Sequence, residues 1–189
     1  MTSFSIVQAF WIIFGLVWLV ASLATKRTKQ RAPLVSRLAY GVLVTAGCYL
    51  MFAGELAFPP LRAHILPPST VKDVVAIVLT ASGIALAMWA RFYIGSNWSS
   101  AVTVKVGHEL IRTGPYRWVR HPIYAGILLA LIGTGLARNH IVVLPGIALC
   151  WIGFWVKSRM EENFMRQTFG EQYVEYCETV GALVPKVRL

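Results

Sequence analysis

Five stretches of the chain contain no Asp, Glu, Lys or Arg, and they limit the possible folds more than any other feature: residues 1–25, 38–54, 74–90, 122–137 and 141–156. A helix that crosses a bilayer needs about 17–25 mostly apolar residues, because it rises about 1.5 Å per residue through a core about 30 Å thick. Only 14% of all residues are charged, against about a quarter in soluble domains. These features predict an all-α integral membrane protein.

The lengths of the stretches predict about five transmembrane helices in one domain, residues 1–189, with the first three helices in residues 1–90. The last two stretches are short and only three residues apart, which predicts a helical hairpin. Short spans are accommodated by local thinning of the bilayer or by burial against other helices. The first stretch has no basic segment before it and runs directly into Lys26, so we expect a helix and not a cleavable signal.

The positions of Lys and Arg predict the orientation in the membrane, because cytoplasmic loops hold the excess of both. Residues 26–37, 91–120 and 157–189 hold five each, whereas the loops on the other side hold three in total. We therefore predict a multi-pass protein with its N-terminus outside and its C-terminus in the cytoplasm.

The net charge of +10 raises the question of a nucleic-acid partner. The basic residues are divided among three short segments next to the membrane, and no nucleic-acid-binding motif is present. Anionic lipid headgroups explain this distribution better, so we expect no nucleic-acid partner. The cysteines Cys48, Cys150 and Cys177 are too far apart for a metal knuckle, and we expect them to pack in the interior, with no metal site.

Two segments outside the predicted helices are long enough to carry chemistry, residues 91–121 and 157–189. The first contains 101-AVTVKV, whose alternation predicts a short strand, and then glycines around 108-HELI that indicate turns. We expect this segment to be an ordered loop. The proline-rich residues 58–73 are expected to be a rigid connector on the other side of the membrane.

The second segment, residues 157–189, holds five of the eight acidic residues and has the pattern of an amphipathic helix along the membrane surface. Lys157 lies four residues before Glu161, so the two side chains share a helix face. One interpretation is a lysine extended towards water with a weak surface ion pair. The other is a polar pocket at the edge of the bilayer.

The segments 107-GHELIRTGPYRWVRHPIYAG-126 and 161-EENFMRQTFGEQYVEY-176 together resemble the integral-membrane methyltransferases of the isoprenylcysteine carboxyl methyltransferase family, which share this signature with phospholipid N-methyltransferases. The resemblance covers residues 91–189. It implies S-adenosylmethionine bound in a cytoplasmic pocket between the loop before the fourth helix and the C-terminal helix, with a lipid or lipid-bearing substrate entering from the bilayer. The cofactor-binding residues that it implies are His108, Glu109, Leu110, Ile111, Tyr116, His121, Pro122, Ile123, Tyr124 and Glu161.

The chemistry of these side chains suits the cofactor. Glu161 is a candidate partner for its ammonium group and ribose hydroxyls, and Arg120 or His121 for its carboxylate. Tyr116 or Trp118 is a candidate wall for adenine, although Arg120 and Trp118 are equally typical of anchors at a membrane interface.

Lys157 and Glu161 are the predicted catalytic residues. The isoprenylcysteine enzymes carry an arginine at the position of Lys157, and lysine keeps the charge but not the planar, two-pronged geometry. A terminal carboxylate is already ionised at pH 7, since its pKa is about 3.5. Methyl transfer to it therefore needs alignment of donor and acceptor and no general base.

Three alternatives remain open at this point. Phospholipid N-methylation would require a base to deprotonate the amine, and Glu162 and His108 are the candidates. An NADPH-dependent membrane reductase of the sterol type has a related Arg-His-Pro-x-Tyr motif. A non-catalytic membrane scaffold would leave the placement of Lys157 and Glu161 unexplained.

Overall fold

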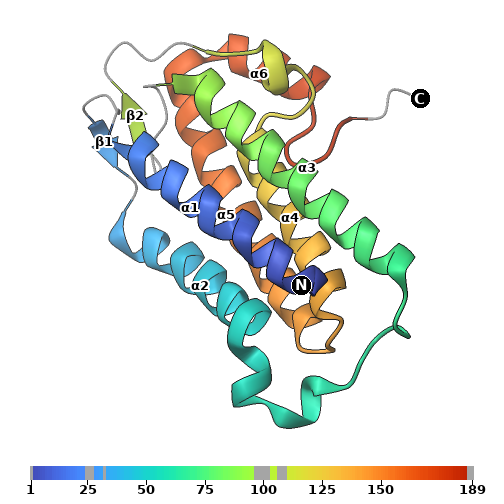
Figure 1. Ribbon diagram of the computed structural model, residues 1–189. Coiled ribbons are helices and arrows are strands. Elements are labelled where there is room, and N and C mark those ends of the chain that lie inside the picture. Colours follow the sequence, from blue (N-terminus) through green and yellow to red (C-terminus); the bar gives the residue numbers. More distant parts are fainter. Residues whose placement is uncertain (1, 24–27, 32, 96–102, 106–109, 187–189) are drawn as a thin grey trace.

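The computed structural model describes residues 2–23, 28–31, 33–95, 103–105 and 110–186 (Figure 1). In this part of the chain the helices are α1 (Ser3–Ser22), α2 (Leu34–Ala57), α3 (Thr70–Ile94), α4 (Pro122–Arg138), α5 (Val143–Phe169) and α6 (Glu171–Thr179), with the single turns η1 (Pro59–Arg62) and η3 (Gly114–Arg117). The described residues also form two short strands, β1 (Thr28–Arg31) and β2 (Thr103–Lys105). The predicted helical fold is confirmed.

Three helices, α1, α2 and α3, are long and apolar enough to cross a membrane. The apolar helix α4 is shorter, with 17 residues, and α5 begins as an apolar helix but continues into a charged segment. The outer surfaces of these helices are apolar too, as shown by Leu16 and Val20 of α1, which are 60% and 68% exposed. Such surfaces suit a lipid environment, where no polar face is required.

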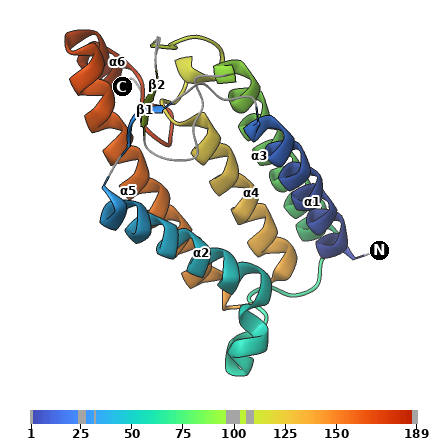
Figure 2. The same ribbon diagram turned by 90° about the vertical axis from the view of Figure 1, so that its left-hand side faces the viewer.

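The helices pack in two groups that meet at α4. Figure 2 shows α1 and α3 on one side of α4, and α2 with α5 on the other. The helices α3 and α4 approach so closely that a Cβ atom on Gly83 would lie 2.4 Å from the backbone nitrogen of Ala130, and one on Gly126 would lie 2.6 Å from the carbonyl oxygen of Gly83. Small residues permit this approach, which is a common way to pack helices within a membrane.

The helices α2 and α5 meet in the same way, since a Cβ on Gly47 would lie 2.5 Å from Cys150 Sγ. Cys48, Cys150 and Cys177 are all free thiols. Cys150 is fully buried within the hydrophobic core and Cys48 packs against it, which confirms the packing role expected for these two.

Polar side chains between the helices have partners. The indole N–H of Trp11 in α1 donates to Thr134 Oγ1 in α4 over 2.9 Å, and Thr134 Oγ1 donates to Ala130 O over 2.8 Å. Near the start of α1, Ser3 Oγ donates to Asp73 Oδ1 over 3.0 Å. These bonds fix α1 against α3 and α4 and give the polar atoms that form them partners between apolar helices.

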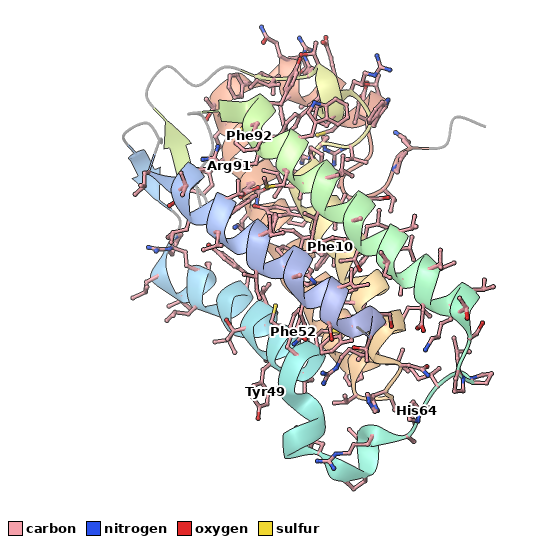
Figure 3. The ribbon with its side chains drawn as sticks, in the orientation of Figure 1. Phe10, Tyr49, Phe52, His64, Arg91 and Phe92 are labelled. Atoms are coloured by element: carbon pink, nitrogen blue, oxygen red, sulfur yellow. The ribbon has the colours of Figure 1, made fainter. Side chains whose placement is uncertain are left out.

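The predicted hairpin of the last two apolar stretches is confirmed as α4, a short turn and α5. Asn139 ends α4 in the left-handed conformation with φ 55°, which asparagine tolerates better than most residues. Its amide donates to Leu66 O over 2.7 Å and accepts from Leu66 N over 2.9 Å. The proline-rich connector is therefore fastened to the hairpin turn, and Figure 3 places His64 at this end of the molecule.

The opposite end carries the strands. The strand predicted from 101-AVTVKV is present as β2, and it pairs antiparallel with β1, which the sequence reading placed in a plain loop. Figures 1 and 2 show this ribbon, the C-terminal end of α3 and α6 gathered at one end of the helices.

The C-terminal region differs from the prediction of one amphipathic helix along the membrane surface. Helix α5 continues without a break from Val143 to Phe169, and α6 follows as a separate helix. Gly170 lies between them with φ 53°, a conformation that glycine adopts readily and that lets the chain change direction. Tyr173 and Tyr176 form the buried side of α6.

Candidate active site

The site is assembled where α4 begins and the charged part of α5 passes it. Pro122 is the first residue of α4 and is fully buried. Proline suits this position because its missing N–H would have no partner in the first helical turn. His121 therefore caps the helix and Tyr124 lies in its first turn, facing α5.

Lys157, Glu161 and Tyr124 form the part of the site nearest the apolar helices. The Tyr124 hydroxyl donates to Glu161 Oε1 over 2.6 Å. Lys157 Nζ lies 5.1 Å from the ring centre of Tyr124 and 5.3 Å from that of Tyr40 in α2. An ammonium over aromatic faces is stabilised by their negative surfaces. The two predicted catalytic residues therefore share one corner with a residue of the His-Pro-x-Tyr motif.

His121 links the two glutamates. Its Nδ1 lies 3.4 Å from Glu161 Oε2, and its Nε2 lies 3.4 Å from Glu162 Oε1. The imidazole also stacks on the Tyr124 ring, with centres 5.6 Å apart and planes inclined by 10°, and Tyr124 in turn stacks on Phe154. The orientation of His121 is thus fixed by two carboxylates and one ring.

Glu162 forms a buried ion pair with Arg120, which donates from Nε over 3.0 Å and from Nη2 over 2.6 Å to Glu162 Oε1. The exposed fraction of the two side chains is 9% for Arg120 and 2% for Glu162. Arg159 approaches the other carboxylate oxygen at 3.7 Å. The sequence reading considered Glu162 only as a base, and the signal that it missed was a second acid next to Glu161 that could pair with Arg120.

These contacts shift the pKa values of Glu161, Glu162 and His121. Burial raises the pKa of Glu162, but His121 and Arg120 outweigh burial and lower it to about 2. Burial also opposes the charge of Glu161, yet His121 and Lys157 lower its pKa. The pKa of His121 falls through burial and rises through both carboxylates, which prevail. The cluster consequently holds ionised carboxylates around a histidine that favours its protonated form.

Arg120 and His121 also anchor the segment after α6. Arg120 Nη1 donates to the carbonyls of Cys177, over 3.3 Å, and Val180. The backbone N–H groups of Arg120 and His121 donate to Gly181 O over 2.8 Å and to Ala182 O over 3.0 Å. Both cations considered for the carboxylate of the cofactor are therefore engaged with Glu161, Glu162 and the C-terminal segment.

Tyr116 lies in η3 and is buried beneath α6. Its hydroxyl donates to Ala90 O over 3.3 Å, and its carbonyl accepts a hydrogen bond from the Tyr176 hydroxyl. Gly114 begins η3 with φ 59°, and a Cβ there would lie 2.6 Å from the Tyr93 ring, so a side chain at this position would strain the backbone and displace that ring. Tyr116 is therefore held in place by α3 and α6.

The remaining predicted residues have different positions. Ile123 belongs to the hydrophobic core, and Ile111 packs against that core. Leu110 is half-buried, and His108 and Glu109 lie outside the described residues. Trp118 is 46% exposed, which fits an interface anchor better than a wall for adenine. No group of three or more His, Cys, Asp or Glu able to hold a metal occurs in the part of the chain that the structure describes.

The chain is similar to several known methyltransferases. The family model of phospholipid methyltransferases matches residues 71–172. The chain is similar to the protein-S-isoprenylcysteine O-methyltransferase of Saccharomyces cerevisiae, with 35% identity over 132 residues, covering 68% of this chain and 55% of the relative. It is also similar to a probable protein-S-isoprenylcysteine O-methyltransferase of Oryza sativa subsp. indica, with 30% identity over 133 residues, covering 69% of this chain and 67% of the relative.

A solved structure is similar as well. It is that of a eukaryotic intramembrane Ras methyltransferase, an isoprenylcysteine carboxyl methyltransferase, with a TM-score of 0.58 and 27% identity, covering 77% of this chain and 52% of the other. The chain spans about half the length of several of the curated relatives that it matches.

Proposed function

This chain belongs to the phospholipid methyltransferase family, and we propose that it is a membrane-embedded, S-adenosylmethionine-dependent methyltransferase that esterifies the carboxylate of a prenylcysteine or similar lipid-bearing acceptor. One similar protein is named protein-S-isoprenylcysteine O-methyltransferase, and another is named a probable protein-S-isoprenylcysteine O-methyltransferase. The observation that carries the proposal is the meeting of Lys157, Tyr124 and Glu161 beside the apolar helices.

The chain is an integral membrane protein, as its family and its apolar helices indicate. We further propose five crossing helices in one domain, with the N-terminus outside. In this arrangement the charged end of α5, with Lys157 and Glu161, lies at the cytoplasmic surface of the bilayer. A substrate with a lipid chain could then keep that chain in the bilayer while its polar end reaches Lys157.

Glu161 fits a role in holding the cofactor. Its side chain is 21% exposed, whereas that of Glu162 is 2% exposed, so Glu161 is the carboxylate of this pair that a ligand reaches more easily. His121 and Tyr124 fix its two oxygens, and an ionised, oriented carboxylate accepts strong hydrogen bonds from an ammonium group or from ribose hydroxyls. When bound, S-adenosylmethionine supplies a methyl group activated by its sulfonium.

Lys157 is suited to the acceptor carboxylate. Its ammonium group lies over the rings of Tyr124 and Tyr40, in surroundings where attraction to an anion is screened less than in water. The proposed role of Lys157 is to position the acceptor carboxylate, while Glu161 positions the donor. Proximity of the two then supplies most of the rate acceleration.

The state of Glu162 argues against an amine acceptor. Deprotonation of an ammonium group works best with a base whose pKa is near the working pH. The pKa of Glu162 is lowered to about 2, and its Oε1 already accepts two hydrogen bonds from Arg120. The other candidate base, His108, lies outside the described residues. A carboxylate acceptor needs no base, which favours ester formation.

The cofactor assignment is tested by calorimetric binding of S-adenosylhomocysteine to the detergent-purified chain, with NADPH as the parallel ligand. We expect binding of the thioether, its loss in Glu161→Ala and its retention in Glu178→Ala, which removes an exposed acid of α6. Binding of NADPH in place of the thioether would overturn the proposal and favour the reductase.

The acceptor assignment is tested by transfer of a labelled methyl group to N-acetyl-S-farnesylcysteine or to phosphatidylethanolamine. We expect the prenylcysteine to be the better acceptor and Lys157→Ala to lower its kcat/KM by about 10- to 100-fold, the loss of one hydrogen bond to a charged group. Full activity of Lys157→Ala or Glu161→Gln, or methylation of the amine alone, would contradict the proposed roles.

A further inference from the structure

An open groove of about 710 Å³ lies between α6 and η3, and none of its lining residues belongs to the Lys157, Glu161 and Tyr124 corner. Arg112 and Arg117 line it from the η3 side and Lys186 from the segment after α6, with Glu175 as the acid among them. The size falls in the range of small-molecule sites, about 300–1,000 Å³. The groove thus combines an excess of positive charge with room for a small polar group.

The ion pairs of the described residues do not balance this positive charge. Within the part of the chain that the structure describes, no carboxylate forms a salt bridge with Arg112 or Arg117. One wall, by contrast, is fixed. Tyr176 lines the groove and its hydroxyl donates to the carbonyl of buried Tyr116. The groove therefore attracts an anion, and this wall is already ordered before binding.

Two tryptophans next to the groove indicate its depth in the membrane. Arg117 lies over the ring of Trp118 at 5.1 Å, and Trp118 packs edge-to-face with Trp89 of α3 at 5.4 Å. These rings are 46% and 43% exposed. Exposed tryptophans concentrate at the level of the lipid headgroups, which places the adjacent groove at the height of lipid phosphates. Figure 3 labels Phe92, near Trp89 in sequence, at this end of α3.

We propose that this groove binds the headgroup of an anionic phospholipid, with Arg112 and Arg117 contacting its phosphate. The negative phosphate is attracted by both arginines, and the tryptophans favour a ligand anchored in the bilayer over a free anion. The groove lies between the loop before α4 and α6, where the family resemblance places the cofactor, but none of its lining residues is among those predicted to bind the cofactor. A lipid bound there would hold η3 and α6 against the membrane surface. Its binding is measured without cofactor or methyl transfer, so failure of this proposal and failure of the proposed function are distinguishable.

The test is native mass spectrometry of the full chain in detergent, titrated with phosphatidylglycerol or phosphatidylcholine. We expect the double variant Arg112→Ala/Arg117→Ala to bind phosphatidylglycerol about thirtyfold more weakly, because each cation near an anionic lipid contributes about a fivefold factor. Wild-type protein should prefer phosphatidylglycerol to phosphatidylcholine, and excess inorganic phosphate should not displace the lipid.

A matched control removes the same charge elsewhere on the predicted cytoplasmic side. Arg37→Ala/Arg166→Ala takes two cations from α2 and α5, outside the groove, and should bind phosphatidylglycerol as the wild type does. Equal loss in this control would indicate diffuse attraction and overturn the proposal, as would unchanged binding in the groove variant or displacement by phosphate. If the double variant does not fold, Arg112→Gln at an exposed position should weaken binding about fivefold.

Discussion

The seam between α3 and α4 and the charged cluster at the end of α5 are both buried contacts between helices, but different forces hold them. At the seam, glycines bring backbones together, and an added Cβ would lie within 2.6 Å of the neighbouring backbone. In the cluster, Arg120, His121, Glu161 and Glu162 hold each other through charge. Added volume should therefore disrupt the seam, whereas added or removed charge should disrupt the cluster.

The largest expected effect is that of Glu162→Gln. This change keeps the volume but leaves Arg120 buried without its charged partner, which costs about 3–5 kcal/mol in comparable buried pairs. Thermal and denaturant unfolding in detergent would measure it. The matched control, Glu178→Gln on the exposed side of α6, should change stability by less than about 0.5 kcal/mol. Equal stability of the two variants would show that charge does not hold the cluster.

Acid should have a similar, slightly smaller effect on the wild type. The pKa of Glu162 is lowered in the folded protein to about 2 from a reference value of 4.5. Its contribution is therefore complete above about pH 4.5 and is lost as the pH falls towards 2, by about 3 kcal/mol at 1.36 kcal/mol per unit. Between pH 5 and pH 2 the free energy of unfolding should fall by this amount in the wild type. In Glu162→Gln it should fall less. Parallel curves would contradict the assignment.

A methyl group at the seam should have the next largest effect. Gly126→Ala places its Cβ 2.7 Å from the backbone nitrogen of Ala87, so α3 and α4 must separate, at a cost of about 1–3 kcal/mol. Gly15→Ala in α1 is the control, because nothing lies within 4 Å of its Cβ, and it should stabilise the helix by about 0.5–1 kcal/mol. If both changes shifted the melting temperature in the same direction, close packing at the seam would not be what makes Gly126→Ala destabilising.

The smallest effect should come from a polar contact near the seam. Trp11→Phe removes the hydrogen bond to Thr134 Oγ1 but keeps most of the apolar ring. Hydrogen bonds between membrane helices contribute about 0.6 kcal/mol on average, so the melting temperature should fall only slightly. A loss comparable to that of Glu162→Gln would mean that polar contacts, and not close packing, hold α1 to α4.

Much of this architecture follows from short-range patterns. The uncharged stretches predicted the helices and the hairpin, because helix formation and burial in lipid depend on runs of neighbouring residues. The i, i+4 spacing of Lys157 and Glu161 predicted that they share a face. The strand β2 was also expected, but its partner β1 was not, because a strand of four residues has too few positions to show an alternation.

The C-terminal helix shows where local patterns are insufficient. Its apolar side was recognised, yet the break at Gly170 and the continuous α5 before it were not, because glycine within a helical pattern is compatible with both a break and a continuous helix. The predicted five spans and the orientation stay predictions, since the structure contains helices but no membrane.

The sequence by itself determined that this is a helical membrane protein, and it identified the two segments where its charged and aromatic residues concentrate. Only the tertiary structure decided that Arg120 pairs with Glu162, 42 residues away, that His121 lies between two carboxylates, and that Arg112, Arg117 and Lys186 line one groove. The reason is physical. Hydropathy and helix periodicity are properties of adjacent residues, whereas these pairings depend on how far each helix is rotated and shifted against the next, which the packing of the glycine seams fixes.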